Sequence, residues 1–202
     1  MSEQTSAFGV VLLAAGASKR MGACKSLLPW GEETILTHIL KQWKSVGATQ
    51  IVPVITPENQ LLQTALAGAG FTPADWIINP APEREMFSSL QEASRWPGWL
   101  PHLTHWIIAL GDQPLIAIST LRCLIEASQE NPDRICQPLF NRLAGHPIIL
   151  PQTVFRELAQ SAHYDLRAFI REHEALRLRV PVNDSGVNED LDTPADYNLW
   201  KP

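Results

Sequence analysis

The chain has 202 residues, of which 45% are hydrophobic and 18% are charged, and its formal net charge is −5. This composition excludes an intrinsically disordered chain, a collagen and a coiled coil, and the length predicts a single domain over residues 1–202. Because the chain is acidic and has no blocks of Lys and Arg, we expect no nucleic-acid partner, since phosphate backbones need many cationic contacts.

The cysteines and the N-terminal segment bear on the cellular compartment. Cys24, Cys123 and Cys136 are widely spaced and form no Cys-x-x-Cys pair that would suggest zinc or a disulfide framework. The apolar run 8–15 is far shorter than the roughly 20 residues of a membrane-spanning helix, and residues 1–7 lack the cations of a signal peptide. We therefore expect a cytoplasmic protein without membrane attachment.

The first half of the chain alternates strand and helix patterns. Residues 8–13 (FGVVLL) are continuously apolar, which is typical of a strand buried on both faces. The patterns that follow predict a helix at 35–46, a strand at 51–55, a helix at 61–66, a strand at 76–78, a helix from about Ser88 and a strand at 105–110. This alternation predicts an α/β fold, in which a three-layer arrangement places helices on both faces of a mostly parallel, Rossmann-like sheet.

The second half is less regular. Its patterns predict a helix at 121–127, strands at 135–140 and 146–150, a helix around Phe169 and a strand at 176–180. Thr193 and Pro194 predict the start of a terminal helix, with Thr193 as the N-cap. In the first half, Pro53 predicts an irregularity or an edge position for its strand, because proline cannot donate to a ladder.

The loop after the first strand combines small residues with cations. Small residues such as Gly16 let backbone N–H groups approach an anion, and Arg20 and Lys25 can neutralise a polyphosphate, so a nucleoside triphosphate fits. The spacing differs from those of the P-loop and the dinucleotide fingerprint. From composition alone, a turn with solvated basic residues is an equal alternative.

Acidic residues follow a buried strand and precede the terminal helix. Asp112 comes directly after the strand at 105–110, while Asp190 and Asp192 lie on a late loop. Ligands of open parallel sheets bind beyond the carboxyl ends of the strands, and one or two carboxylates with phosphate oxygens suffice for Mg²⁺. Taken singly, Asp112 could be a turn residue, and the late pair could be solvated while Asp196 supports the terminal helix.

Four motifs, in order along nearly the whole chain, add a resemblance. They are LAAGASKRMGACK at 13–25 followed by LLP at 27–29, GDQP at 111–114, GHP at 145–147 and DLDTPADY at 190–197. Together they resemble the signature of the nucleotidyltransferases with a glycosyltransferase-A-like fold (the nucleotide-diphospho-sugar transferase fold). Within that group the chain most resembles the molybdenum cofactor cytidylyltransferases.

The resemblance implies Mg²⁺-dependent transfer of CMP from CTP to the phosphate of molybdopterin, with release of pyrophosphate. It implies catalytic roles for Arg20, Lys25 and Asp112, with Lys25 near the α-phosphate, and metal binding by Asp112 and Asp192, with Asp190 close behind. The positions implied to bind substrate are Leu13, Ala14, Ala15, Gly16, Ser18, Arg20, Lys25, Ser89, Asp112 and His146.

Two of these positions have ordinary structural alternatives. Ser89 matches a position where related enzymes contact the base or ribose, but a hydroxyl at a helix start also caps the helix. The family usually has a glycine where this chain has Glu85, so the base pocket departs from the usual pattern. The resemblance places His146 on the acceptor side, although a lone histidine is more often structural.

Three rival functions stay open. The choice of cytidine rests on Ala15, because the guanylyl branch commonly carries a second glycine in the first motif, which makes a guanylyltransferase the nearest rival. The same scaffold also serves sugar and polyol phosphates. A non-catalytic maturation factor that delivers the cofactor to a molybdenum hydroxylase client is the third, but it would not need a metal site that activates a triphosphate.

Overall fold

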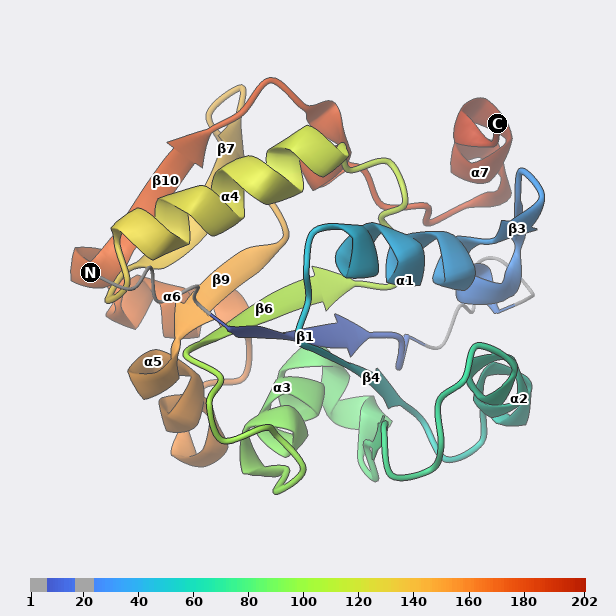
Figure 1. The fold of residues 1–202 in the computed structure, drawn as a ribbon, viewed down its shortest axis with the longest axis horizontal. Helices are drawn as coiled ribbons and strands as arrows, with labels where there is room; N and C mark the ends of the chain where they lie inside the picture. The colour runs from blue at the N-terminus through green and yellow to red at the C-terminus, as the bar shows by residue number, and fades with distance from the viewer. Residues whose placement is uncertain (1–6, 17–23) are drawn as a thin grey trace.

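A computed structural model describes residues 7–16 and 24–202, and it is built around a mixed sheet (Figure 1). The order of the sheet is β10-β7-β9-β6-β1-β4-β5, and β8 pairs with β7 at the side. Its strands are β1 (Phe8–Leu13), β4 (Gln50–Ile55), β5 (Ile77–Ile78), β6 (His105–Leu110), β7 (Ile135–Phe140), β8 (Leu143–Ala144), β9 (Ile148–Pro151) and β10 (Arg177–Pro181). A separate hairpin joins β2 (Pro29–Trp30) to β3 (Glu33–Thr34).

The sheet is mostly parallel, as predicted. β1 is parallel to both β4 and β6, β4 is parallel to β5, and β7 is parallel to β10. The exception along the main path is β9, which is antiparallel to both β6 and β7. Because β9 is antiparallel to both of its neighbours, β7 runs in the same direction as β6. Since β1 and β6 are parallel, their carboxyl ends meet at one edge of the sheet.

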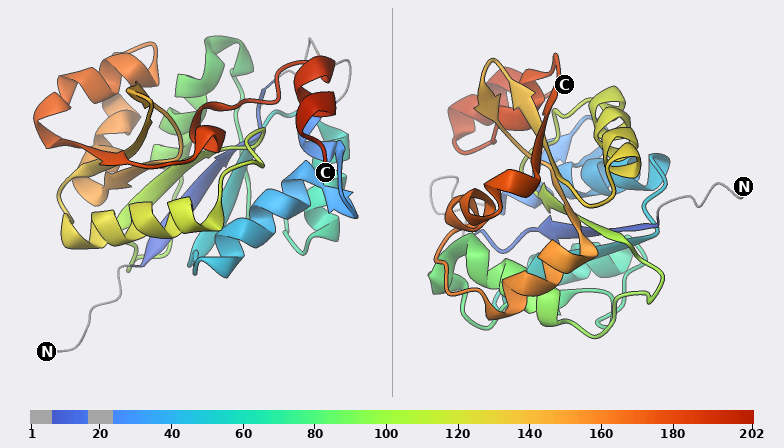
Figure 2. Two further views of the ribbon diagram at one scale, coloured as in Figure 1. Left: turned by 90° about the horizontal axis from the view of Figure 1, so that it is seen from above. Right: turned by 90° about the vertical axis from the view of Figure 1, so that its left-hand side faces the viewer.

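Helices cover both faces of the sheet and give it three layers (Figures 1 and 2). Val10 and Leu12 of β1 pack with α1 (Ile35–Ser45), α2 (Gln60–Gly68) and α4 (Ile118–Glu130). Val11 points to the other face, where it packs with α3 (Glu85–Arg95), α5 (Gln152–Glu157) and α6 (Leu166–Glu172). A strand with apolar side chains on both faces is therefore buried from both sides, as its sequence predicted.

Short elements complete the described chain. They are the 3₁₀ helices η1 (Lys25–Leu27), η2 (Pro82–Arg84), η3 (Leu158–Gln160), η4 (Glu174–Leu176) and η5 (Ser185–Asn188), and the terminal helix α7 (Pro194–Trp200). Among the described residues, the helices include none with the length and apolar character needed to span a membrane.

The prediction that Pro53 marks an edge or an irregularity holds only locally. β4 lies between β1 and β5 and Pro53 keeps its register with Leu12, but β5 does not extend as far as Pro53. The carbonyl of Val54 accepts a hydrogen bond from the Ala14 N–H, so Val54 faces β1 and Pro53 faces the other side. On that side β5 pairs only with Val54 and Ile55. The missing N–H of Pro53 therefore interrupts no ladder.

Candidate functional site

The carboxyl ends of β1 and β6 lie against each other, and this contact fixes the start of the loop that carries Asp112. The Gly111 N–H donates to the carbonyl of Leu13 at 2.9 Å, which extends the pairing of the two strands by one residue. A Cβ atom at Gly111 would lie 2.9 Å from that same carbonyl and 3.3 Å from the Ala14 Cβ. Only glycine fits this approach, and Asp112 follows it directly.

The loop between η5 and α7 brings two further carboxylates to the same place. Its buried Leu191 donates its N–H to the carbonyl of Asp112 at 3.1 Å, which ties the loop to the end of β6. Gln113 donates from Nε2 to Asp190 Oδ1 at 2.7 Å. Asp192 lies one residue before Thr193, the N-cap of α7.

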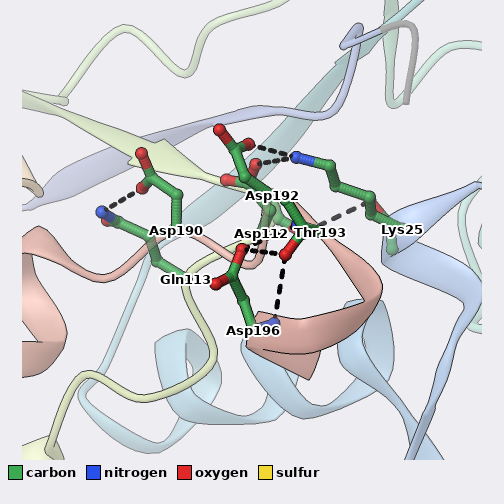
Figure 3. Close-up of polar contacts among 9 residues, drawn as sticks. Lys25, Asp112, Gln113, Asp190, Asp192, Thr193 and Asp196 are labelled. Atoms are coloured by element: carbon green, nitrogen blue, oxygen red, sulfur yellow. Dashed lines mark hydrogen bonds and ion pairs between the residues drawn. The ribbon is translucent and has the colours of Figure 1, made fainter. Parts of the chain in front are cut away.

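Lys25 connects the two acidic loops, as Figure 3 shows. Its Nζ donates to Asp112 Oδ2 at 3.2 Å and to Asp192 Oδ1 at 2.6 Å. Lys25 begins η1, and the hydroxyl of the next residue, Ser26, donates to the Gly111 carbonyl at 3.3 Å. Three residues that lie up to 167 positions apart in the sequence thus meet at the carboxyl edge of the sheet.

Burial and opposite charges shift the pKa values of this cluster. Burial raises the pKa of the Asp112 carboxyl, and the charges of Asp190 and Asp192 add to this effect, although Lys25 opposes it. Burial also raises the pKa of Asp190. Burial lowers the pKa of Lys25, but its hydrogen bonds to Asp192 and Asp112 and their charges outweigh this effect and raise it overall. Lys25 is therefore held in its charged form.

The oxygen donors at this edge fit a hard divalent cation. Carboxylate oxygens of Asp112 and Asp192 both reach one small cationic group, the Lys25 ammonium. Mg²⁺ is commonly held by one or two carboxylates, with waters and substrate phosphates completing its shell. Within the described ranges, no group of three or more His, Cys, Asp or Glu side chains could hold a metal.

The predicted phosphate loop is described at its two ends, residues 13–16 and 24–25. Leu13 ends β1, and the Ala14 N–H donates to the Val54 carbonyl, so both are fixed by the sheet. Ala15 is partly exposed. Gly16 is exposed, and apart from its chain neighbours no atom of the described residues lies within 4 Å of where its Cβ would be. The predicted contacts of Ser18 and Arg20 lie outside the described residues.

Ser89 does not cap a helix, so that interpretation is wrong. The helix begins at Glu85 after the turn η2, its N-cap is Arg84, and Ser89 lies in its interior. The Ser89 side chain is 2% exposed, and its hydroxyl accepts a hydrogen bond from Nδ2 of the buried Asn79 at 2.9 Å. A contact between Ser89 and a base or ribose stays a prediction.

His146 lies where η5 meets β9, and its backbone is tightly constrained. Its N–H donates to the Val187 carbonyl at 2.9 Å, and its peptide bond to Pro147 is cis. A Cβ atom at the preceding Gly145 would lie 2.1 Å from the same carbonyl, so a side chain cannot be placed there. Burial lowers the pKa of the His146 imidazole to about 4, and the ring is therefore neutral near pH 7.

Sequence reasoning missed residues that hold the acidic loop in place. Gln113 is buried, and besides its bond to Asp190 it lies 3.5 Å from the Val187 carbonyl. The capping box of α7 was only partly predicted: Thr193 accepts from the Asp196 N–H at 3.2 Å, while the Asp196 carboxylate accepts from the Thr193 N–H at 2.8 Å. Two features of the sequence could have indicated these contacts: the side-chain amide of Gln113 next to Asp112, and the Thr-x-x-Asp spacing of Thr193 and Asp196, which is typical of a capping box.

Proteins similar to this chain include enzymes with different names. The chain is 25% identical over 195 residues to the molybdenum cofactor cytidylyltransferase of Escherichia coli, covering 95% of this chain and 94% of the relative. It is 27% identical over 193 residues to the nicotine blue oxidoreductase of Paenarthrobacter nicotinovorans, covering 91% of both. The crystal structure of Rv0371c from Mycobacterium tuberculosis aligns with a TM-score of 0.74 and 30% identity, covering 96% of this chain and 97% of that one.

A family model matches most of the chain. The model of the MobA-like NTP transferase domain matches residues 10–176, which include most of β1, η1 and the strand that precedes Asp112. The matched region thus contains the buried strand, the lysine and the first carboxylate of the site described above. The chain therefore belongs to the MobA-like NTP transferase family.

Proposed function

We propose that this chain is a Mg²⁺-dependent cytidylyltransferase, which transfers CMP from CTP to the phosphate of molybdopterin and forms molybdopterin cytosine dinucleotide and pyrophosphate. Membership of a nucleotidyltransferase family supports the class of reaction. Two relatives with different names are 27% and 25% identical to this chain, so sequence identity does not choose between their activities. We therefore base the cytidylyltransferase reaction on the residues of the site.

One observation carries the proposal. Lys25, Asp112 and Asp192, which were expected to act on a triphosphate and its metal, converge through contacts of 3.2 and 2.6 Å. A carrier that only binds and delivers a cofactor has no need for two partly buried carboxylates around one cation. A triphosphate, in contrast, needs both a divalent cation and a nearby ammonium to neutralise its charge.

The reaction needs no covalent enzyme intermediate. An oxygen of the acceptor phosphate attacks the α-phosphorus of CTP, a new P–O bond forms, and the bond from the α-phosphorus to the bridging oxygen breaks in line. Pyrophosphate leaves with the electron pair of that bond. Bound Mg²⁺ would neutralise phosphate charge and fix the triphosphate conformation.

The chain supplies positioning and charge for this step. Asp112 and Asp192 would hold the cation, with Gln113 keeping Asp190 beside them. Lys25 would stabilise the charge that develops near the α-phosphate, since an ammonium placed before the reaction costs no reorganisation in the transition state. Arg20, on the first motif, would neutralise the outer phosphates.

Cytidine and molybdopterin are supported by fewer residues. The Ala15 position in the first motif matches the cytidylyl pattern, and a relative named as a molybdenum cofactor cytidylyltransferase aligns over 95% of the chain. Ser89 would act on the base or ribose, and His146 on the acceptor side. A molybdenum hydroxylase would be the client that receives the product.

The experiment is a direct comparison of nucleotides. The protein is incubated with Mg²⁺, molybdenum cofactor and CTP, GTP, ATP or UTP in turn, and pyrophosphate and the dinucleotide product are measured. We expect CTP to give the highest kcat/KM and cytosine dinucleotide as the product. Preference for GTP would overturn the base assignment, and turnover with a polyol phosphate in place of the cofactor would overturn the acceptor.

A matched pair of variants tests the site itself. Asp112→Asn removes a carboxylate from the cation site, and we expect it to abolish product formation. Asp133→Asn makes the same change on the exposed loop before β7, at the opposite end of the sheet, and should retain wild-type turnover. Equal turnover by both variants, or unchanged cofactor transfer to the client by Asp112→Asn, would favour a carrier over an enzyme.

A further inference from the structure

Lys25 lies between the two carboxylates that would hold a metal ion. Its Nζ contacts one oxygen of Asp112 at 3.2 Å and one oxygen of Asp192 at 2.6 Å, and we call this pair of carboxylates the cation seat. The side chain of Lys25 is 13% exposed, whereas those of Asp112 and Asp192 are 28% and 38% exposed. Solvent can therefore reach the carboxylates, but the space between them is taken by an ammonium group.

A divalent cation and this ammonium compete for the same position. Both are attracted by the same two negative charges, and at such short separations they repel each other strongly where water is partly excluded. A divalent ion that enters the cation seat must therefore displace the ammonium or bind against its repulsion. Either route weakens the binding of a free metal ion to the protein.

The side chain of Lys25 can change its position while its backbone stays in place. The Ser26 hydroxyl donates to the Gly111 carbonyl, and the carbonyl of Lys25 accepts the N–H of Leu28 at 3.0 Å, so the backbone from Lys25 to Leu28 is held against the end of β6. The four-carbon stem of a lysine, in contrast, has several rotatable bonds and ends in a point charge. The ammonium can exchange one set of oxygen partners for another while η1 stays in place.

We infer that Lys25 serves as an internal counter-ion that keeps the cation seat closed to free divalent ions until a nucleoside triphosphate brings the metal with it. This inference rests on the proposed function, because the triphosphate supplies the new partners. Its oxygens offer the displaced ammonium a second set of negative charges, close to where the reaction needs a positive one. Metal and nucleotide then enter as one complex, and Lys25 changes from counter-ion to catalytic group in the same event.

The test measures metal binding to the nucleotide-free protein, with Mn²⁺ alone as the probe. Free Mn²⁺ is followed by electron paramagnetic resonance during titration of wild type, Lys25→Met and Lys25→Arg. We expect Lys25→Met to bind Mn²⁺ at least about tenfold more tightly than wild type, because it keeps most of the length of the side chain without its charge. Lys25→Arg, which keeps the charge, should remain as weak as wild type.

Two further variants separate this effect from general changes in charge. Adding Asp112→Asn to Lys25→Met should remove the gain in affinity, because the cation seat then loses one carboxylate. Lys41 lies on α1, outside the cation seat, and its ammonium pairs with Glu33 of β3 at 2.5 Å. Lys41→Met removes this cation and should bind Mn²⁺ as wild type does. If Lys25→Met does not fold, Lys25→Gln also removes the charge, and its affinity for Mn²⁺ can be measured instead.

The outcomes for the two hypotheses are distinct. Equal or weaker Mn²⁺ binding by folded Lys25→Met and Lys25→Gln would overturn the counter-ion role, even if the wild-type protein proves to be a cytidylyltransferase. Tighter Mn²⁺ binding by these variants would support the role of Lys25 as counter-ion. The nucleotide comparison tests the transferase reaction separately, and its failure would remove the triphosphate step while leaving the measured competition between Lys25 and Mn²⁺ intact.

Discussion

The N–H of Leu191 donates a hydrogen bond to the carbonyl of Asp112 at 3.1 Å. This contact joins the end of β6 to a loop almost eighty residues later through backbone atoms, and it places the carboxylates of Asp112 and Asp192 on either side of Lys25. The alignment of the two acidic residues is thus set by the main chain. Single side-chain changes should therefore alter the chemistry of the site without separating the two loops.

Replacing Asp112 with Asn should remove turnover while the fold persists. The amide keeps the size of the side chain but not the charge that a divalent cation needs, and we expect kcat/KM for CTP to fall at least about a hundredfold. Pyrophosphate release reports the activity, and thermal unfolding reports the fold. An Asp112→Asn protein with near wild-type turnover would contradict a metal role for this residue.

Replacing Lys25 with Ala should mainly lower kcat. If the ammonium acts on charge that appears in the transition state, its loss costs roughly a hundredfold in kcat and less in KM for CTP. Steady-state kinetics with varied CTP separate the two parameters. A rise in KM with unchanged kcat would mean that Lys25 binds ground and transition states equally.

The capping box of α7 should matter to catalysis because it begins immediately after Asp192. Thr193→Ala removes a helix cap, so we expect a loss of about 1 kcal/mol in the free energy of unfolding. It should also lower kcat/KM, since the cap orients the chain that carries Asp192. Urea unfolding and pyrophosphate release measure the two effects.

The N-cap of α6 offers a matched control for that prediction. Asp165 accepts the Ala168 N–H at 2.7 Å, and Asp165→Ala should cost a similar amount of stability. Because α6 packs on the opposite face of the sheet from α1 and α4, the catalytic constants should stay at wild-type values. Equal losses of activity in Thr193→Ala and Asp165→Ala would assign the effect to stability alone.

His146 should make the protein less stable in mild acid. Its pKa in the fold is about 4, below the ordinary 6.5, so between these values the unfolded chain binds a proton that the folded protein excludes. Stability contributed by neutral His146 is therefore present near pH 7 and is lost as the pH falls through this window. The loss between pH 7 and pH 5 should be about 2 kcal/mol.

Urea unfolding of wild type and His146→Gln at both pH values checks this prediction. The variant cannot titrate at position 146, so its stability should fall less between pH 7 and pH 5 by about the same amount. His105, whose pKa burial also lowers, is present in both proteins and its contribution cancels. Identical pH dependence of the two proteins would mean that the imidazole is not buried in its neutral form.

The main strands, and the edge of the sheet where the site lies, could be predicted from the sequence. β1 and β6 carry continuous apolar runs, and because parallel strands end at one edge, Asp112 could be placed at the ligand-binding edge from pattern alone. β9 was predicted as a strand, but its antiparallel direction depends on pairing with both β6 and β7. The short helix α5, with only two buried side chains in its span, left too weak a pattern to be predicted.

The contacts within the site were harder to predict than its members. Lys25, Asp112 and Asp192 were all expected at the site, but the contact of Lys25 with both carboxylates depends on long-range geometry. The support that Gln113 gives to Asp190 likewise needs the η5–α7 loop to fold back onto β6. Capping by Ser89, one of two roles considered for it, is excluded because α3 begins at Glu85, directly after η2, which places Ser89 in the helix interior.

A crystal structure of the protein with Mn²⁺ and a CTP analogue that resists cleavage tests the central claim most directly, because anomalous scattering locates the metal without reference to the chain. We predict a manganese peak coordinated by Asp112 and Asp192 and by triphosphate oxygens, with the Lys25 ammonium moved onto a phosphate. A metal peak at another surface, or a triphosphate bound away from these carboxylates, would contradict the account.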